Sequence, residues 1–287
     1  MVVKPVIGVC LWLIEGKDMS DTIDWCVKNG FGGISLSQVF MAREKAERVG
    51  AAKALAFSGL NLTYHGGVSH KVTTSGMLDR GFVKDVIEDV LFWHENAGGI
   101  KSFCFDPVKV PGKGSEFILE INKKYAVMLS ETFKKKGIQL GVENVFNSAL
   151  EFSSLEVISD FKTECKDLGL GMLFDAAHAN IHVRSDAIKG ENEIGAYFEA
   201  LPYEVLEIHL SDNKGVKDEH RGLGNGNLDL SALVKAAKKK GFKGQFSVEV
   251  CKDILKGQYG MNIHDLEEIS PVLKSRDKLL EAMKENW

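Results

Sequence analysis

Short apolar runs alternate with amphipathic segments along the sequence, and this alternation is the feature that most restricts the fold. Eight runs have the length and composition of buried strands, and their starts follow one another at intervals of 27 to 42 residues. The predicted strands cover residues 5–12, 33–36, 60–65, 102–105, 139–144, 171–175, 205–210 and 246–250. The predicted helices cover residues 21–29, 41–57, 79–96, 115–136, 153–167, 194–200, 230–240 and 270–286.

Eight strand–helix units of this size predict parallel strands that are joined by helical crossovers. The simplest closure is a (β/α)8 TIM barrel of the α/β class, whose typical length of about 250 residues leaves room for modest loop insertions. An open, doubly wound sheet is the alternative, but the G-x-G-x-x-G turn that is common in such sheets does not follow the first predicted strand. Because no Pro/Ser-rich linker and no shift of composition divides the sequence, we expect one barrel domain over residues 1–287.

The charge balance bears on the class of partner. The chain has 36 basic and 40 acidic residues and a formal net charge of −4, and only six of the basic residues are arginine. A general nucleic-acid binder is more often basic, so a small-molecule substrate is favoured, although a local basic face would still be compatible with nucleic acid. The sequence leaves open whether the chain forms a homo-oligomer.

Cysteine usage and hydropathy bear on the location of the protein. Five cysteines occur and no two of them form a C-x-x-C pair, which is typical of reduced thiols that fill the core of a cytoplasmic protein. No apolar run reaches about 18 residues and no N-terminal segment has the pattern of a signal peptide, so we expect no membrane association.

Polar side chains gather at the ends of the predicted strands. In a TIM barrel the C-terminal ends of all strands face one pocket, and the catalytic residues lie there. The first two strands end in Trp12, Ser37 and Gln38, which are poor metal ligands. The later strands and the residues just after them carry His65, Asp106, Glu143, Asn144, Asp175, His178, His209, Asp212, Asn213 and Glu249.

So many ionisable groups in one pocket would repel or desolvate one another unless another charge neutralised them. A divalent cation does this, and three carboxylates with one imidazole suit Mn²⁺, Mg²⁺ or Zn²⁺ while leaving positions for substrate oxygens. We therefore predict a metal site formed by Glu143, Asp175, His209 and Glu249, with no organic cofactor. The alternative is that these are four separate structural residues, each with its own local hydrogen bonds.

A second set of polar residues is predicted to bind further metal ions or to grip substrate hydroxyls. It consists of His65, Asp106, His178, Asp218, His220 and Arg221. Asp218 and His220 precede a loop with three glycines between residues 222 and 226, where the backbone can approach a ligand closely. The backbone N–H groups of this loop, or Lys252, are candidates for binding a phosphate group. The alternative is an ordinary glycine-rich loop with solvated charges.

These segments resemble the xylose-isomerase-like barrel superfamily, which includes sugar and sugar-phosphate isomerases and epimerases and also endonuclease IV. The matching segments are Gly141-Val142-Glu143-Asn144, residues 174–180, residues 208–215, the loop of residues 218–229, and residues 247–250. They cover the fifth to eighth predicted strands, whereas the resemblance over residues 1–100 rests on His65.

The resemblance implies a role in carbohydrate metabolism. In the sugar epimerases of this superfamily two strand-end glutamates bind the metal and move protons, so Glu143 and Glu249 would take these roles. The metal would acidify the C–H beside a ketose carbonyl, one glutamate would remove the proton, and the other would return a proton to the opposite face. A 1,2-isomerisation needs the same groups with a different proton return. The other residues to which the resemblance gives a role are Asp175 and His209 as metal ligands, and His178 and Arg221 as groups that hold substrate oxygens.

Endonuclease IV is the rival within the superfamily, and it implies cleavage at apurinic/apyrimidinic sites by three zinc ions. Eight of its nine ligand positions match, namely His65, Glu143, Asp175, His178, His209, Asp218, His220 and Glu249. The ninth, a histidine before proline, is Asp106 before Pro107. In addition, residues 65–69 contain none of the bulky side chains that enter the DNA. Sugar isomerisation or epimerisation is therefore favoured, with endonuclease and other polyol chemistry, such as dehydration, as alternatives. A non-catalytic ligand-binding barrel is disfavoured because the set of metal-ligand residues is full.

Overall fold

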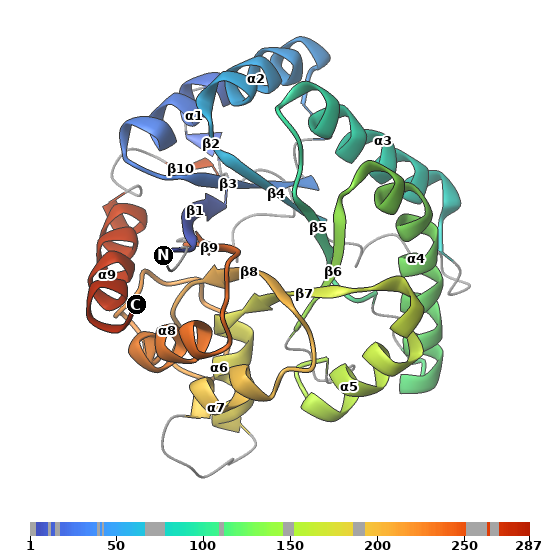
Figure 1. Ribbon diagram of the computed structural model, residues 1–287, viewed down its shortest axis with the longest axis vertical. Coiled ribbons are helices and arrows are strands. Elements are labelled where there is room, and N and C mark those ends of the chain that lie inside the picture. The colour runs from blue at the N-terminus through green and yellow to red at the C-terminus, as the bar shows by residue number, and fades with distance from the viewer. Residues whose placement is uncertain are drawn as a thin grey trace.

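Eight parallel strands close into a barrel in the part of the chain that the structure describes (Figure 1). The structure is a computed structural model, and it describes residues 4–10, 13–14, 18–38, 41, 43–66, 78–108, 112–145, 152–185, 193–250, 263–264 and 270–287. Around the barrel the strands are β1 (Val6–Cys10), β3 (Gly33–Ser37), β4 (Asn61–Gly66), β5 (Ser102–Phe105), β6 (Gln139–Glu143), β7 (Gly171–Asp175), β8 (Val205–Leu210) and β9 (Gln245–Val248). Because β1 pairs with both β3 and β9, the described sheet is closed, so the predicted TIM barrel is confirmed and the doubly wound sheet is wrong.

Helices surround the barrel in the crossovers between strands (Figure 1). Their bounds are α1 (Met19–Lys28), α2 (Lys45–Ser58), α3 (Arg80–Asn96), α4 (Ser115–Lys136), α5 (Leu155–Glu164), α6 (Ala176–Ser185), α7 (Glu193–Ala200), α8 (Leu230–Lys239) and α9 (Ser270–Asn286), with a 3-10 helix, η2, at Lys166–Leu168. Helix α8 illustrates why these segments are helical. The Asp229 carboxylate caps its N-terminus, Leu233 and Ala237 are buried on one face, and Lys238 at its C-terminal end is exposed. None of the described helices combines the length and apolarity that a membrane span requires.

Two elements differ from the sequence-based expectation. Helix α6 begins directly after β7, where the expectation placed no helix because residues 174–180 fit a strand-end motif. Its first turn is stabilised by Asp175, whose carboxylate accepts a hydrogen bond of 2.7 Å from the backbone N–H of His178. A small parallel sheet of β2 (Leu13–Ile14) and β10 (Ile263–His264) was also not expected, since two residues are too short to show a periodicity.

The barrel interior is filled in part by a polar side chain. Gln245 on β9 lies across Gly8 on β1 and Gly33 on β3, and a β-carbon at either glycine would overlap the Gln245 side chain. On another side of the barrel Leu206 fills the space that Gly141 and Gly171 leave open. Glycines in neighbouring strands therefore make room for large side chains that reach across the barrel.

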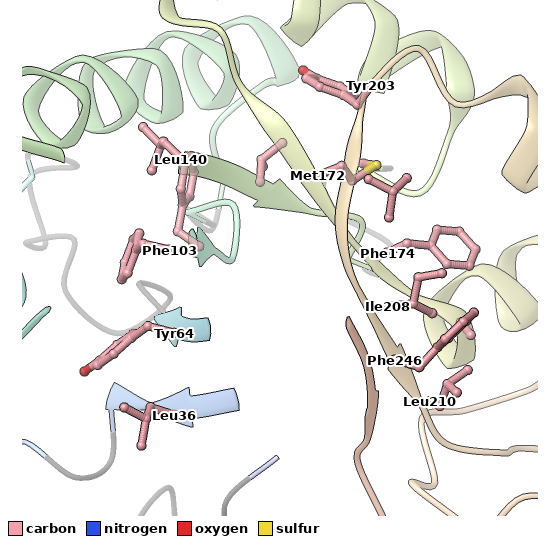
Figure 2. Packing of buried hydrophobic residues seen from close by; sticks show 14 of the residues in the cluster. Leu36, Tyr64, Phe103, Leu140, Met172, Phe174, Tyr203, Ile208, Leu210 and Phe246 are labelled. Carbon is pink, nitrogen blue, oxygen red and sulfur yellow. The ribbon is translucent and has the colours of Figure 1, made fainter. Parts of the chain in front are cut away.

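The main apolar core lies between the strands and the surrounding helices. Aromatic and aliphatic side chains on the outer face of the strands form it, as Figure 2 shows for Phe103, Phe174, Ile208 and Phe246. Phe174 packs edge-on against Phe198 of α7, with ring centroids 4.9 Å apart. Burial of a side chain of this size contributes about 2–3 kcal/mol, so this layer holds each helix against its strands.

Candidate active site

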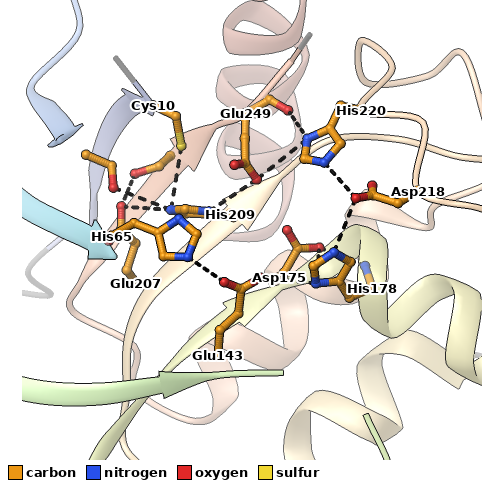
Figure 3. Close-up of polar contacts among 12 residues, drawn as sticks. Cys10, His65, Glu143, Asp175, His178, Glu207, His209, Asp218, His220 and Glu249 are labelled. Carbon is orange, nitrogen blue, oxygen red and sulfur yellow. Dashed lines mark hydrogen bonds and ion pairs between the residues drawn. The ribbon is translucent and has the colours of Figure 1, made fainter. Parts of the chain in front are cut away.

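Acidic and imidazole side chains form a ring at the C-terminal end of the barrel (Figure 3). They lie at the ends of the neighbouring strands β4 to β9 or in the segments that follow these strands, and they point toward one another. All are predicted site residues, and the ring contains His65, Asp106, Glu143, Asp175, His178, His209, Asp218, His220 and Glu249.

On one side of the ring Glu143 lies between two histidines. Its Oε2 atom is 2.6 Å from Nε2 of His65, and its Oε1 atom is 3.0 Å from Nδ1 of His178. Nε2 of His65 also lies 2.7 Å from Oδ1 of Asp106. Glu143 is 2% exposed, so its charge is balanced by these neighbours and not by water.

On the opposite side Glu249 also lies between two histidines. Its Oε2 atom is 3.2 Å from Nδ1 of His209 and 3.7 Å from Nδ1 of His220. Asp218 connects the two sides, because its Oδ2 atom is 2.8 Å from Nε2 of His220 and 3.3 Å from Nε2 of His178. The two glutamates therefore face the same pocket from β6 and from the end of β9 (Figure 3).

The electrostatic field of the ring keeps both glutamates ionised. Burial opposes the ionisation of Glu249, but His209 and His220 lower its pKa to about 2. Burial likewise opposes the ionisation of Glu143, but His65 and His178 hold its pKa well below the ordinary range. Both carboxylates are therefore ionised at neutral pH.

Asp175 and His220 titrate closer to neutrality. Burial raises the pKa of Asp175 and, although His178 opposes this, nearby carboxylates keep it at about 7. Burial alone would lower the pKa of His220, but Glu249 and Asp218 raise it to about 9. Imidazolium protons thus balance the carboxylates, and a divalent cation would take over this role by displacing them.

The described residues offer three groups of metal-ligand atoms. They are Glu143 with Asp175 and His178, His209 with Glu249 and Cys10, and His65 with Asp106 and Glu143, and within each group the ligand atoms lie within 4.8 Å of one another. The four predicted ligands are thus divided between two of these groups, and no single group contains all four of them.

Three buried atoms of the ring also fit a cation. Oε2 of Glu143, Nδ1 of His209 and Oδ1 of Asp218 are buried and have no aligned hydrogen bond to any described residue. Such atoms are costly to bury unless they coordinate a ligand. The donor set and these three atoms therefore fit a divalent metal ion.

The glycine-rich loop after β8 is organised around one buried carboxylate. Asp212 accepts hydrogen bonds from the backbone N–H groups of Gly224, Gly226 and Leu228 at 2.8, 2.9 and 3.0 Å. The loop therefore folds back over β8 and carries His220, whose φ of 42° is in the left-handed region. Because Asp212 already uses N–H groups of this loop, they are not free to bind the phosphate that the sequence had suggested.

The remaining polar residues lie outside the ring or outside the described residues. The guanidinium of Arg221, a predicted site residue, lies 2.7 Å from the carboxylate of Glu219, which does not belong to the ring. His182 and His94 have structural roles, His182 against the ring of Tyr197 and His94 as an acceptor from a backbone N–H group. Trp12, residues 67–70, Cys251 and Lys252 lie outside the described residues.

Two residues near the ring were not predicted to belong to it. The thiol of Cys10, expected to be core filler, lies 3.6 Å from Nε2 of His209. Cys10 and the other described cysteines are all buried free thiols. Glu207 lies 3.5 Å from the same nitrogen. Glu207 could have been found, since it precedes His209 by two residues and side chains two apart on a strand face the same side.

Comparison with known proteins places the chain in a structural context. A family model described as xylose isomerase-like TIM barrel matches residues 23–276. One curated relative of the chain is an uncharacterized protein of Methanocaldococcus jannaschii, which is 27% identical over 176 residues. The match covers 58% of this chain and 53% of the relative, so the chain spans about half of that relative's length.

Solved structures with the same fold include two sugar epimerases. An L-ribulose 3-epimerase is 16% identical with a TM-score of 0.74, and the match covers 99% of this chain and 96% of that one. A D-allulose 3-epimerase from Methylomonas sp. is 18% identical with a TM-score of 0.69, and the match covers both chains fully, at 100%. At this level of identity the likeness shows the shared barrel fold.

Proposed function

Because the chain belongs to the xylose isomerase-like TIM barrel family, we propose that it is a divalent-metal-dependent isomerase or epimerase of a sugar or sugar phosphate. The observation that carries this proposal is the placement of Glu143 and Glu249 on two sides of one pocket, each ionised and each between two histidines. The sugar epimerases among its structural neighbours support the same choice.

The two glutamates are suited to move a proton between the faces of a planar intermediate. One carboxylate removes the proton from the carbon beside the ketose carbonyl. The other glutamate takes up a proton from a neighbouring imidazolium and delivers it to the opposite face of the resulting enediolate. A divalent cation held by Glu143, Asp175, His209 and Glu249 would polarise the carbonyl and stabilise negative charge on its oxygen. In an isomerisation the proton would return to the neighbouring carbon instead.

The remaining residues of the ring would bind and orient the sugar. Carboxylates hold the rings of His65, His178 and His220 in place, and a bound sugar would compete with these carboxylates for the imidazole N–H groups. Such donors match the hydroxyl and carbonyl oxygens of a polyol chain. Since Asp212 uses the N–H groups of the glycine-rich loop, the described part of the pocket favours hydroxyl groups over a phosphate at this loop.

The experiment that tests the proposal follows the proton. The protein purified with Mn²⁺, Mg²⁺ or Zn²⁺ is incubated with a panel of ketoses and ketose phosphates in D₂O, and deuterium at the carbon beside the carbonyl is measured by NMR. We expect metal-dependent incorporation together with an epimer or isomer. Lack of incorporation with every sugar of the panel and every metal would contradict the proposal.

Endonuclease IV-like cleavage at apurinic/apyrimidinic sites is the second candidate, and one observation favours it. Asp218 lies between His178 and His220, and together with the group around His65 this gives enough ligand atoms for more than one metal ion. Metal content separates the two candidates, because one ion per chain supports the isomerase whereas two or three zinc ions support the nuclease. Nicking of duplex DNA with an abasic site tests the nuclease directly.

A cytoplasmic location stays a prediction, and whether the chain forms a homo-oligomer stays open. Four described cysteines are buried free thiols, which supports a reducing compartment. Measurement of the molecular mass in solution by light scattering would settle the assembly.

A further inference from the structure

Beneath the ring lies a buried carboxylate that the proposed mechanism does not use. Glu207 on β8 is fully buried, and its Oε1 atom accepts a hydrogen bond of 2.5 Å from the hydroxyl of Ser247. Its Oε2 atom is buried without a hydrogen-bond partner among the described residues. A buried carboxylate costs several kcal/mol unless a partner compensates it, so the groups around Glu207 indicate what it does.

The two nitrogens of His209 face different surroundings. Nδ1 is directed toward the pocket, 3.2 Å from Oε2 of Glu249. Nε2 faces the barrel interior, where Oγ of Ser35, Oε1 of Glu207 and Sγ of Cys10 lie at 3.4, 3.5 and 3.6 Å. The neighbours of Nε2 are thus a hydroxyl, a thiol and a carboxylate, and the carboxylate is the strongest acceptor among them.

We infer that Glu207 is a positioning residue, which keeps the hydrogen of the His209 imidazole on Nε2 and so leaves the lone pair of Nδ1 for the metal ion. This inference rests on the proposed metal site. A histidine that binds a metal commonly donates its other ring N–H to a carboxylate, which fixes both the tautomer and the orientation of the ring.

Glu207 is itself held by side chains of the neighbouring strand β9. Nε2 of Gln245 lies 2.8 Å from Oγ of Ser247 and 3.4 Å from Oε1 of Glu207. Gln245 in turn is wedged against Gly8 and Gly33 on the first two strands of the barrel. The orientation of the His209 ring is therefore tied to the place where the barrel closes.

The geometry also separates this role from that of a metal ligand. Glu207 approaches Nε2 of His209, whereas Glu249 approaches Nδ1 on the pocket side of the same ring. A cation held at Nδ1 would have its other ligands among the residues of the ring, and Glu207 would act on it through the imidazole.

Three variants and one control test this role. Glu207→Met removes the acceptor at similar length, Glu207→Gln removes the charge, and Ser247→Ala removes the hydroxyl that holds Glu207. The control is Asp89→Asn, which alters another buried carboxylate that is paired with Arg48 and with the hydroxyl of Tyr64, away from the ring.

The first readout is metal affinity, measured by calorimetry with Zn²⁺ and Mn²⁺ and with the unfolding temperature recorded for every variant. Changes of this kind around a metal-binding histidine weaken affinity by about 10- to 100-fold. We expect the loss to be largest for Glu207→Met and smaller for Glu207→Gln and Ser247→Ala. Asp89→Asn should lower the unfolding temperature and leave the affinity within about 2-fold.

The second readout is NMR of the zinc-loaded protein labelled with ¹⁵N-histidine, with the His209 signal assigned by its loss in His209→Gln. In the unaltered protein we expect a slowly exchanging Nε2–H proton, which a merely structural role of Glu207 would not create. In Glu207→Met this proton should exchange faster and its resonance should shift. If Glu207→Met does not fold, the other two variants decide the matter by the same measurements.

The outcomes separate this inference from the function on which it rests. Failure of the unaltered protein to bind any divalent metal would overturn both. Metal binding by the unaltered protein, with equal affinity and an unchanged His209 signal in the Glu207 and Ser247 variants, would overturn the role of Glu207 alone.

Discussion

Replacement of Glu249 by glutamine is the change that most directly tests the proposed chemistry. Glutamine has the shape of a protonated glutamate, so the substitution removes the charge and the proton acceptor while it keeps the volume. In the structure Oε2 of Glu249 lies 3.2 Å from Nδ1 of His209 and 3.7 Å from Nδ1 of His220, so its charge stabilises both imidazoles. We therefore expect separate effects on stability and on turnover.

The effect on stability follows from the pKa of Glu249. The fall of this pKa from 4.5 to about 2 corresponds to about 3 kcal/mol of stability, because one pKa unit corresponds to about 1.4 kcal/mol. The sign is that of a lowered carboxyl pKa, so this stability is present above pH 4.5 and is lost as the pH falls through 2. A domain is stable by about 5–15 kcal/mol, so the metal-free variant should lose about 3 kcal/mol at pH 7 and remain folded.

The effect on turnover should be far larger. General acid–base catalysis contributes about 10²- to 10⁴-fold, and the loss of a metal ligand adds to it. We expect deuterium incorporation into the substrate ketose to fall by at least about 10³-fold. Urea unfolding followed by circular dichroism measures the stability, and NMR in D₂O measures the exchange.

A matched control makes the result decisive. Glu95→Gln removes an exposed carboxylate on α3 that is paired with Lys136, so it should leave both quantities unchanged. Full exchange activity in Glu249→Gln at saturating metal would refute the role of Glu249 as proton carrier. A folded Glu249→Gln variant without activity, beside an active Glu95→Gln variant, is the result that the structure predicts.

Three further predictions follow from other parts of the structure. The pKa of Asp175 is raised from 3.8 to about 7 and that of His220 from 6.5 to about 9, so the metal-free protein loses stability as the pH rises from about 4 to about 9. Its unfolding temperature should fall over this range while the stabilisation by added Zn²⁺ grows, and a flat profile in calorimetry would contradict this. Asp212→Asn should weaken the hydrogen bonds that three backbone N–H groups of the loop donate to this carboxylate, and so lower the free energy of unfolding in urea by about 3 kcal/mol. Amide exchange in residues 220–228 should become faster. Unchanged exchange there would show that Asp212 does not anchor the loop. In Gly33→Ala the new methyl group should overlap the Gln245 side chain and destabilise the protein by about 1–3 kcal/mol. Adding Gln245→Ala should recover part of this loss. Strictly additive losses in the double variant would disprove the contact.

The fold could be predicted in detail because the pattern of each strand is local. The predicted bounds of three strands, 102–105, 171–175 and 205–210, agree with β5, β7 and β8 to the residue. Helix α4 likewise spans the expected residues 115–136, since the lysines at its C-terminal end and Gly137 in the left-handed conformation mark where it stops. Helix α6 could not be found in this way, because its first turn is capped by a residue that also belongs to the site.

The membership of the ring could also be predicted, but its internal pairing could not. Strand ends give the residues that face the pocket, which is why His65, Glu143 and Glu249 were expected there. Which imidazole lies beside which carboxylate depends on the tilt of the strands and the register between them, and one sequence does not contain these quantities. For the same reason Cys10 was expected to be core filler, although the end of β1 brings its thiol next to His209.

The contact of Gln245 with the first strands bears on how the chain reaches its native state. The strand that carries Gln245 is the last of the barrel, and Val6 of the first strand pairs with Gln245 itself. During synthesis the first strand must therefore wait for nearly all of the chain before it gains its second neighbour, and until then Gly8 and Gly33 border an unfilled space. Contacts between such distant segments form slowly, so we expect closure of the barrel between β1 and β9 to be a late step in folding.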